Sequence, residues 1–189
     1  MQEREHGHDD VRQSKGVPGY MPERAVTRYE LAATLFQLLT HVEAAYAQPK
    51  RVMREVKPGR KANLTPNVSK AKRYSDVPAL HWASAGIAGL GARGIVAVVS
   101  GKFEGEKTVS GDELALWLEG MAGWVEGRPA SAKSLKELVR AGYLPQTDPL
   151  LKKTTKPVSA QEVITIAAAV LTRAQEKITT AAADSRFGK

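Results

Sequence analysis

The chain contains no cysteine, which excludes disulfide scaffolds and thiolate metal sites. Its longest stretch of low polarity, residues 86–100, contains Arg93 and is too short to cross a bilayer, so we expect no transmembrane segment. Residues 1–15 contain one aliphatic side chain, Val11, and lack the apolar centre of an export signal. Phosphate-binding glycine loops, zinc-ligand spacings and catalytic acid pairs are also missing, so we expect neither a cofactor nor an enzymatic activity.

Acidic residues are scarce in one segment, between Ala47 and Arg73, where nine basic residues accompany a single acid, Glu55. This excess (nine less one) equals the net charge of +8 of the whole 189-residue chain. Because the segment also contains three prolines and a glycine, it is typical of a solvated linker. It offers cationic side chains for an anionic polymer, namely Lys50, Arg51, Arg54, Lys57, Arg60 and Lys61.

One six-residue pattern occurs three times, as Val26–Leu31, Val109–Leu114 and Val158–Val163. Each copy contains Ser or Thr at its second position and Glu three residues later, which is the capping box that begins a helix. Each copy also has an apolar residue before the cap and another at the fourth helical position, the pair that forms a hydrophobic staple. The repeat therefore predicts three helices that begin in the same way.

Apolar residues follow each of these starts at spacings of three and four, which predicts amphipathic helices and an all-α fold. A shorter helix precedes the second and third starts and is expected to end at Gly94 and Gly142, with Asp76 as a candidate cap before the first of them. We expect six segments: a disordered lead (1–15), a partial first repeat (16–47), the basic linker (48–73), a second repeat (74–127), a diverged third repeat (128–178) and a frayed tail (179–189).

The second repeat carries an ordered set of motif residues. Tyr74, Asp76 and Val77 precede His81-Trp82-Ala83, then Gly94-Ile95-Val96, a Gly-x-Phe turn ending at Phe103, and the second capping box. The first repeat contains Val-Thr-Arg-Tyr-Glu-Leu-Ala at residues 26–32. In this order and spacing the chain resembles the S-layer homology (SLH) domain, which normally has three tandem motifs.

The resemblance implies a pseudo-threefold helical bundle that anchors exported proteins without covalent bonds to the cell envelope, at the cell surface. Its ligand would be a cell-wall glycan, either an acidic or pyruvylated secondary wall polysaccharide or modified peptidoglycan. The family's carbohydrate-binding groove maps onto Arg28, Asp76, His81, Trp82 and Gly94. The second and third repeats have Gly111 and Ala160 where the motif has arginine, so we expect at most one complete groove.

Physical chemistry supports parts of this mapping. An arginine one residue into a helix lies near unpaired N–H groups and the positive end of the helix dipole, which favours an anion such as a sugar carboxylate. The indole of Trp82 suits the apolar face of a sugar ring. Structural roles remain open for each residue: a solvated Arg28, a core Trp82, an Asp76 that caps a helix or fixes a loop, and a His81 that makes structural hydrogen bonds.

Two other functions are compatible with the sequence. A small helical nucleic-acid-binding protein would use the basic residues 50–73 for phosphate contacts, although this segment lacks aromatic side chains for base stacking. A decayed fragment of a larger exported protein would keep the helix packing without binding a ligand.

Overall fold

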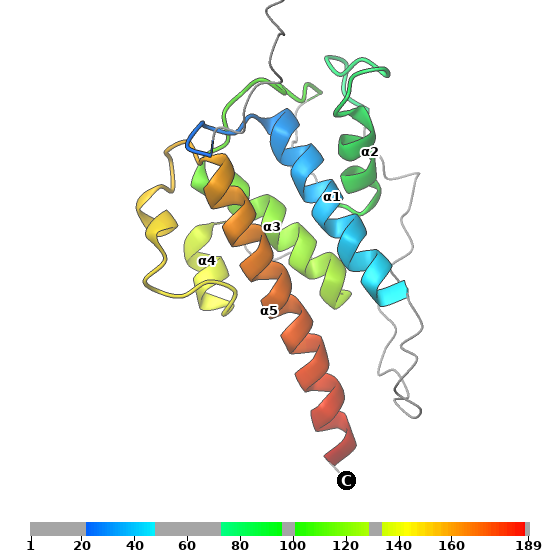
Figure 1. Ribbon diagram of the computed structural model, residues 1–189, viewed down its shortest axis with the longest axis vertical. Helices are drawn as coiled ribbons and strands as arrows, with labels where there is room; N and C mark the ends of the chain where they lie inside the picture. The colour runs from blue at the N-terminus through cyan, green and yellow to red at the C-terminus, as the bar shows by residue number, and fades with distance from the viewer. Residues whose placement is uncertain (1–21, 48–72, 96–100, 129–133, 188–189) are drawn as a thin grey trace, which may run out of the picture.

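The computed structural model describes residues 22–47, 73–95, 101–128 and 134–187, and these contain helices, turns and isolated bridges but no strand. The helices are α1 (Arg28–Ala47), α2 (Ser84–Ala92), α3 (Gly111–Glu126), α4 (Leu135–Arg140), the 3-10 helix η2 (Pro149–Lys152) and α5 (Ala160–Phe187) (Figure 1). The predicted all-α class is therefore confirmed. Among the described helices, none has the length and apolarity needed to cross a membrane.

The repeated pattern begins the three main helices as predicted. Thr27 and Ser159 form complete capping boxes, because each side chain accepts from the N–H of the third helical residue while Glu30 or Glu162 accepts from the N–H of the cap. At the second start, Ser110 accepts from the N–H of Glu113, but the Glu113 carboxylate binds Arg28 from another repeat. The staple residues at all three starts are buried: Val26, Leu31, Val109, Leu114, Val158 and Val163.

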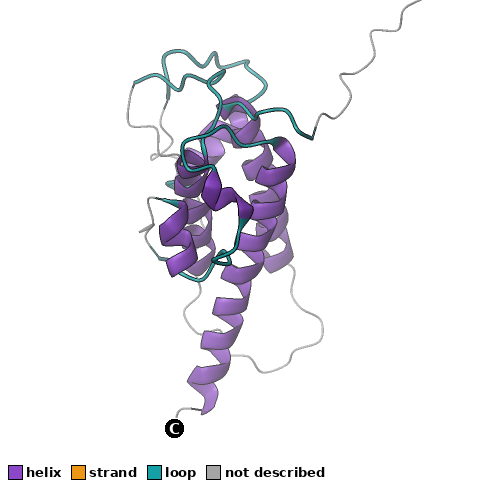
Figure 2. Ribbon diagram, turned by 90° about the vertical axis from the view of Figure 1, so that its left-hand side faces the viewer, coloured by secondary structure: helices purple, strands orange, loops and turns teal. Residues whose placement is uncertain are grey.

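Backbone hydrogen bonds join the three starts in a closed cycle. The N–H of Val26 donates to the carbonyl of Val158, that of Val158 to Val109, and that of Val109 back to Val26, at 2.9, 2.9 and 3.0 Å. The N-terminal ends of α1, α3 and α5 therefore meet at one end of the molecule, where the connecting loops gather in Figure 2.

A second set of bonds runs round the cycle in the opposite sense. The first two helical N–H groups of each main helix donate to the turn that precedes the next start, at the residues two and four positions before its valine. The donor and acceptor pairs are Arg28 to Lys107 and Tyr29 to Gly105, Gly111 to Lys156 and Asp112 to Thr154, and Ala160 to Arg24 and Gln161 to Pro22. Three kinds of backbone hydrogen bond thus each occur three times, which makes nine bonds in all.

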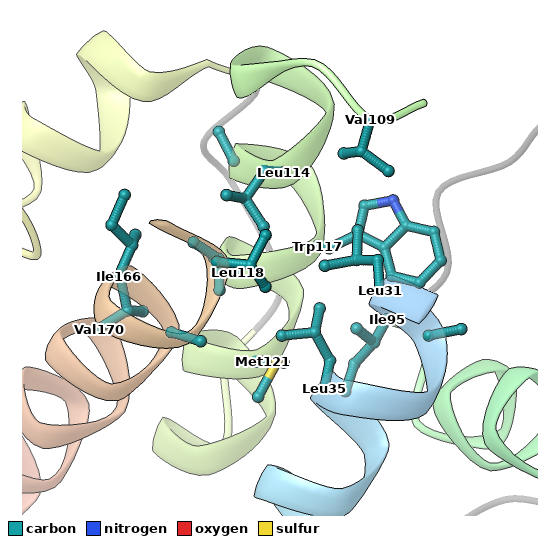
Figure 3. Packing of buried hydrophobic residues seen from close by; sticks show 14 of the residues in the cluster. Leu31, Leu35, Ile95, Val109, Leu114, Trp117, Leu118, Met121, Ile166 and Val170 are labelled. Atoms are coloured by element: carbon teal, nitrogen blue, oxygen red, sulfur yellow. The ribbon is translucent and has the colours of Figure 1, made fainter. Parts of the chain in front are cut away.

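The buried core lies among α1, α3 and α5, with α3 between the other two (Figure 3). Trp117, Leu118 and Met121 of α3 are at most 1% exposed. Leu118 and Met121 lie between Leu35 of α1 and Val170 of α5, whereas the ring of Trp117 lies beside Leu31 of α1. Trp117 is therefore a core residue. Burial of the apolar side chains of the whole core is the main favourable contribution to folding.

The short helices α2 and α4 pack against α1 and α3, respectively. Gly94 and Gly142, which follow them, have φ of +72° and +79°, the left-handed conformation predicted for the helix terminators. Glycine also lets α2 approach α1 closely: a Cβ on Gly89 would lie 2.2 Å from the ring of Phe36. This contact sets the spacing of the two helices.

Two local expectations are wrong. Asp76 does not cap α2, whose N-cap Ala83 makes no side-chain capping bond, because the Asp76 carboxylate binds a turn elsewhere. The tail expected to fray from residue 179 instead continues α5 to Phe187, and the alanines at 181–183 have high helix propensity. The lead 1–15 and nearly all of the linker 48–73 lie outside the described residues.

Candidate functional site

Arg28 and Asp76 hold the same turn, Phe103–Glu104, from two sides. The Arg28 guanidinium donates to the Phe103 carbonyl at 2.8 Å, to Glu104 Oε2 at 3.1 Å and to Glu113 Oε1 at 2.5 Å. Its side chain is only 11% exposed, whereas that of Glu104 is 53% exposed. Arg28 is therefore neither solvated nor unpaired, and of its two carboxylate partners the one near solvent is Glu104.

The Asp76 carboxylate receives two short backbone hydrogen bonds, from the N–H of Phe103 and the N–H of Glu104, each 2.7 Å long. Partial burial opposes ionisation of this group, but these bonds outweigh it and lower the pKa of Asp76. They also hold Glu104 at φ of +53°, a left-handed conformation that non-glycine residues rarely adopt. Asp76 thus fixes the loop, which is one of its two expected structural roles.

The ring of Tyr29 connects this turn with two further aromatic side chains, His81 and Trp82. The ring of Tyr29 lies 4.1 Å from that of His81, 6.1 Å from Trp82 and 5.6 Å from Phe103, measured between centroids. Tyr29 and Phe103 are buried, but Trp82 is 62% exposed and lies before α2 rather than in the core. His81 Nδ1 accepts from the N–H of Ala83, which fixes the loop that presents the indole. We call the surface formed by Arg28, Tyr29, Asp76, His81, Trp82 and Glu104 the α1 corner.

Gly94 does not belong to the α1 corner. It follows the C-terminal end of α2, whereas Trp82 precedes the N-terminal end, and nine helical residues between them span about 13 Å. The structure thus brings together four of the five predicted site residues, Arg28, Asp76, His81 and Trp82, and separates the fifth.

The expected anion site at the start of α1 is not available. The N–H groups of Arg28 and Tyr29 donate to the carbonyls of Lys107 and Gly105 in the neighbouring repeat. Sequence inspection missed this because the partners are about 80 residues away in the chain. An anion at this corner would therefore depend on the Arg28 side chain alone.

The equivalent positions in the other repeats differ in the space they offer. A Cβ on Gly111 would lie 2.5 Å from the carbonyl oxygen of Lys153, so the motif arginine cannot be accommodated there without moving the backbone. Ala160 is only partly buried. The glycine at the second start is thus a packing requirement and not simply a lost ligand group.

Two ionic networks were not predicted. Arg93 binds both oxygens of Glu43, at 2.7 and 2.6 Å, and the indole N–H of Trp124 donates to the same carboxylate at 2.8 Å. Elsewhere, the Arg128 guanidinium binds Glu119 and Glu126 and contacts the Tyr143 hydroxyl. Burial first, and then the hydrogen bond to Glu126, raises the pKa of Tyr143 to about 12. Both networks join repeats and are structural.

Protonation of Asp76 should lower the free energy of unfolding in acid. Its carboxyl group titrates near pH ~4 in the unfolded chain and lower in the folded one, so the unfolded state binds more protons between these values. The contribution of Asp76 is therefore complete above pH ~4 and is lost as pH falls through the lower native pKa. We expect Asp76→Asn to flatten the acid limb of a plot of denaturation midpoint against pH, and Glu23→Gln, at an exposed carboxylate, to leave it unchanged. An acid limb unaltered by Asp76→Asn would contradict this assignment.

The described residues contain no group of three His, Cys, Asp or Glu side chains positioned to hold a metal ion. The basic side chains proposed to contact an anionic polymer, from Lys50 to Lys61, lie outside the described part of the chain. In comparisons with known proteins, no family model matches the sequence, and no curated protein or solved structure is detectably similar to it.

Proposed function

We propose that this protein is a non-catalytic cell-envelope anchoring module that binds a wall glycan, either an acidic polysaccharide or modified peptidoglycan, at the α1 corner. The observation that carries the proposal is the exposed indole of Trp82 next to Tyr29, whose ring in turn contacts Phe103 of the turn that Arg28 and Asp76 hold. A flat aromatic face with nearby hydrogen-bonding and charged groups is a suitable surface for a sugar ring that carries a carboxylate.

We further propose that the three repeats form a pseudo-threefold bundle of the SLH type. The support is the cycle through Val26, Val109 and Val158, together with the matching bonds from each helix start to the next turn. A cycle of equivalent contacts is expected where three copies of one unit pack about a common axis. This arrangement places Arg28 of the first repeat on the turn of the second.

Glu104 defines how an acidic ligand would bind. Its carboxylate occupies one position on the Arg28 guanidinium, and at 53% exposure it has room to leave that position for solvent. A ligand carboxylate would replace Glu104 there, while Glu113, at 18% exposure, remains on the other side of Arg28. The exchange conserves the charge around the arginine, so its net cost is small.

Binding to purified wall material tests this function. We expect Trp82→Ala to weaken co-sedimentation about ten-fold, which corresponds to ~1.4 kcal/mol, because the indole contacts the sugar without supporting the core. Leu80→Ala is the matched control, since Leu80 is fully exposed on the same loop and borders neither Arg28 nor Tyr29. Equal binding by the wild type and Trp82→Ala would refute the proposed site.

Two further variants separate specific binding from charge attraction. Glu104→Gln should strengthen binding to acidic wall polymer, because it removes the carboxylate that competes with the ligand for Arg28. It should leave binding to a neutral glycan unchanged. Arg28→Ala should weaken binding far more than Lys57→Ala. Equal losses from these two, or retention on DNA that disappears when residues 50–73 are deleted, would instead favour nonspecific binding through the basic segment.

A further inference from the structure

The outward face of α5, formed by Ile164, Thr165 and Ala168, is identified by comparison with α1 and α3. Because Val26, Val109 and Val158 occupy equivalent places in the hydrogen-bonded cycle, residues the same number of positions beyond them are also equivalent. Ile164 corresponds to Ala32 and Ala115, Thr165 to Ala33 and Leu116, and Ala168 to Phe36 and Glu119. These three positions form one helical face in each repeat.

On α1 this face is covered by α2. A Cβ on Gly86 would lie 3.3 Å from the Ala32 carbonyl oxygen, and Gly89 lies directly against the ring of Phe36. Ala32 is fully buried, and Ala33 and Phe36 are partly buried. The glycines of α2 therefore allow close helix contact at these positions.

On α3 the equivalent face is also covered. Ala115 and Glu119 are fully buried and Leu116 is partly buried. Helix α4 packs against α3 and is thus the counterpart of α2. Two of the three equivalent faces accordingly carry a short helix.

On α5 the same face is open in the described structure. Ile164 is 40% exposed, and Thr165 and Ala168 are also exposed. In Figure 1, α2 flanks α1 on one side and α4 lies on the other side of the molecule, whereas the viewer-facing length of α5 has no described helix across it. Ile164 is one of few large apolar side chains exposed in the described residues.

Residues 1–9 precede Val26 by the same number of positions as α2 precedes Val109, so they are the segment of this chain that corresponds to α2 in the first repeat. In that register, Arg4 and Gly7 stand where α2 has the buried Ile87 and Leu90. In the register of α4, Glu3 and His6 stand where it has the buried Leu135 and Leu138. Burial of unpaired charges at such positions is unfavourable, so these residues do not suit the face.

We propose that the open face of α5 is a docking site for a short amphipathic helix from a partner polypeptide. The helix would resemble α2 in chemistry, with small residues toward Ile164 and Thr165 and a pair of Ile or Leu residues three positions apart toward the core. Because Ala168 is much smaller than Phe36, it leaves room for a larger side chain where α2 has Gly89. The partner helix would give α5 the covering helix that α1 and α3 already have. This site is independent of the α1 corner.

The probe is a peptide of residues 81–95 that carries Gly89→Leu, and it is titrated into the full-length protein. We expect saturable NMR shifts at the amides of Ile164, Thr165 and Ala168 with a Kd below about 1 mM, and at least a ten-fold weaker Kd with Ala168→Lys. Arg173→Ala is the matched control, because Arg173 lies on the same helix about 140° away from Ala168 and should leave the Kd unchanged. A peptide with Ser at positions 87 and 90 should not bind.

Three results would overturn the proposal. One is the absence of these shifts at millimolar peptide, or shifts confined to Ala32 and Ala33, which would mean that the peptide only displaces α2. Another is a homodimer that Ala168→Lys dissociates in sedimentation, because the occupant would then be a second copy. The last is faster amide exchange at residues 164–168 after deletion of residues 1–15, because the chain would then cover its own face.

Discussion

Replacing Arg93 with alanine should destabilise the protein by about 3–5 kcal/mol, a typical cost of breaking a buried ion pair. The Arg93 side chain is 8% exposed and binds both oxygens of Glu43, which is itself 19% exposed. Its removal leaves the Glu43 carboxylate without its cation and takes the guanidinium away from the rings of Phe36 and Trp124. Thermal and denaturant unfolding would measure the loss, with Tm expected to fall by roughly 10 °C.

Two variants test whether the stranded carboxylate is the cause. Glu43→Gln in the Arg93→Ala background should recover most of the stability, because glutamine keeps an acceptor for the Trp124 indole N–H without a buried charge. Arg173→Ala, which removes a surface pair with Glu176, should cost less than ~1 kcal/mol. A loss in Arg93→Ala as small as that of the surface variant would show that the pair is not important for stability.

Gly111→Arg should destabilise the protein by several kcal/mol, on the order of 2–4, although it restores the motif arginine. The new Cβ would begin 2.5 Å from the Lys153 carbonyl oxygen and 2.8 Å from Leu135 Cδ1. The backbone of the third repeat would have to move away, and the bonds from the start of α3 to Lys156 and Thr154 would lengthen. Chemical denaturation and amide exchange in α4 would detect this separation.

Ala160→Arg is the matched control, since it places the same side chain at the same helical position of the third repeat. Ala160 already has a Cβ and is partly exposed, so we expect a change within ~0.5 kcal/mol. Comparable losses in both variants would show that an arginine at this position is unfavourable by itself and that the close contact at Gly111 is not the reason.

The sequence predicted what depends on neighbours in the chain. The side-chain caps Thr27, Ser110 and Ser159, the stapled valines and the left-handed Gly94 and Gly142 are local features, and each is found where expected. The ends of elements were less predictable: α5 runs ten residues past Lys177, through a stretch that includes three consecutive alanines, the residue with the highest helix propensity.

The chemistry of the α1 corner was less accessible, because it depends on contacts between repeats. The pattern located Arg28 and Trp82 but could not show that Arg28 has two carboxylate partners or that its backbone N–H is already bonded. Glu113 gave a misleading signal, since its position in a capping box predicts a local partner and it pairs instead with Arg28. The Arg93 and Glu43 pair has no local signature, because 50 residues separate its members.

The hydrogen bond from Val26 to Val158 joins residues 132 positions apart (158 less 26). During synthesis, the first repeat therefore waits for the last before its backbone is fully paired, and contacts this distant slow folding by the entropy of closing the chain. A linear array of repeats can lose a terminal unit and keep the rest, whereas removal of either end here would leave orphaned backbone groups in both remaining repeats.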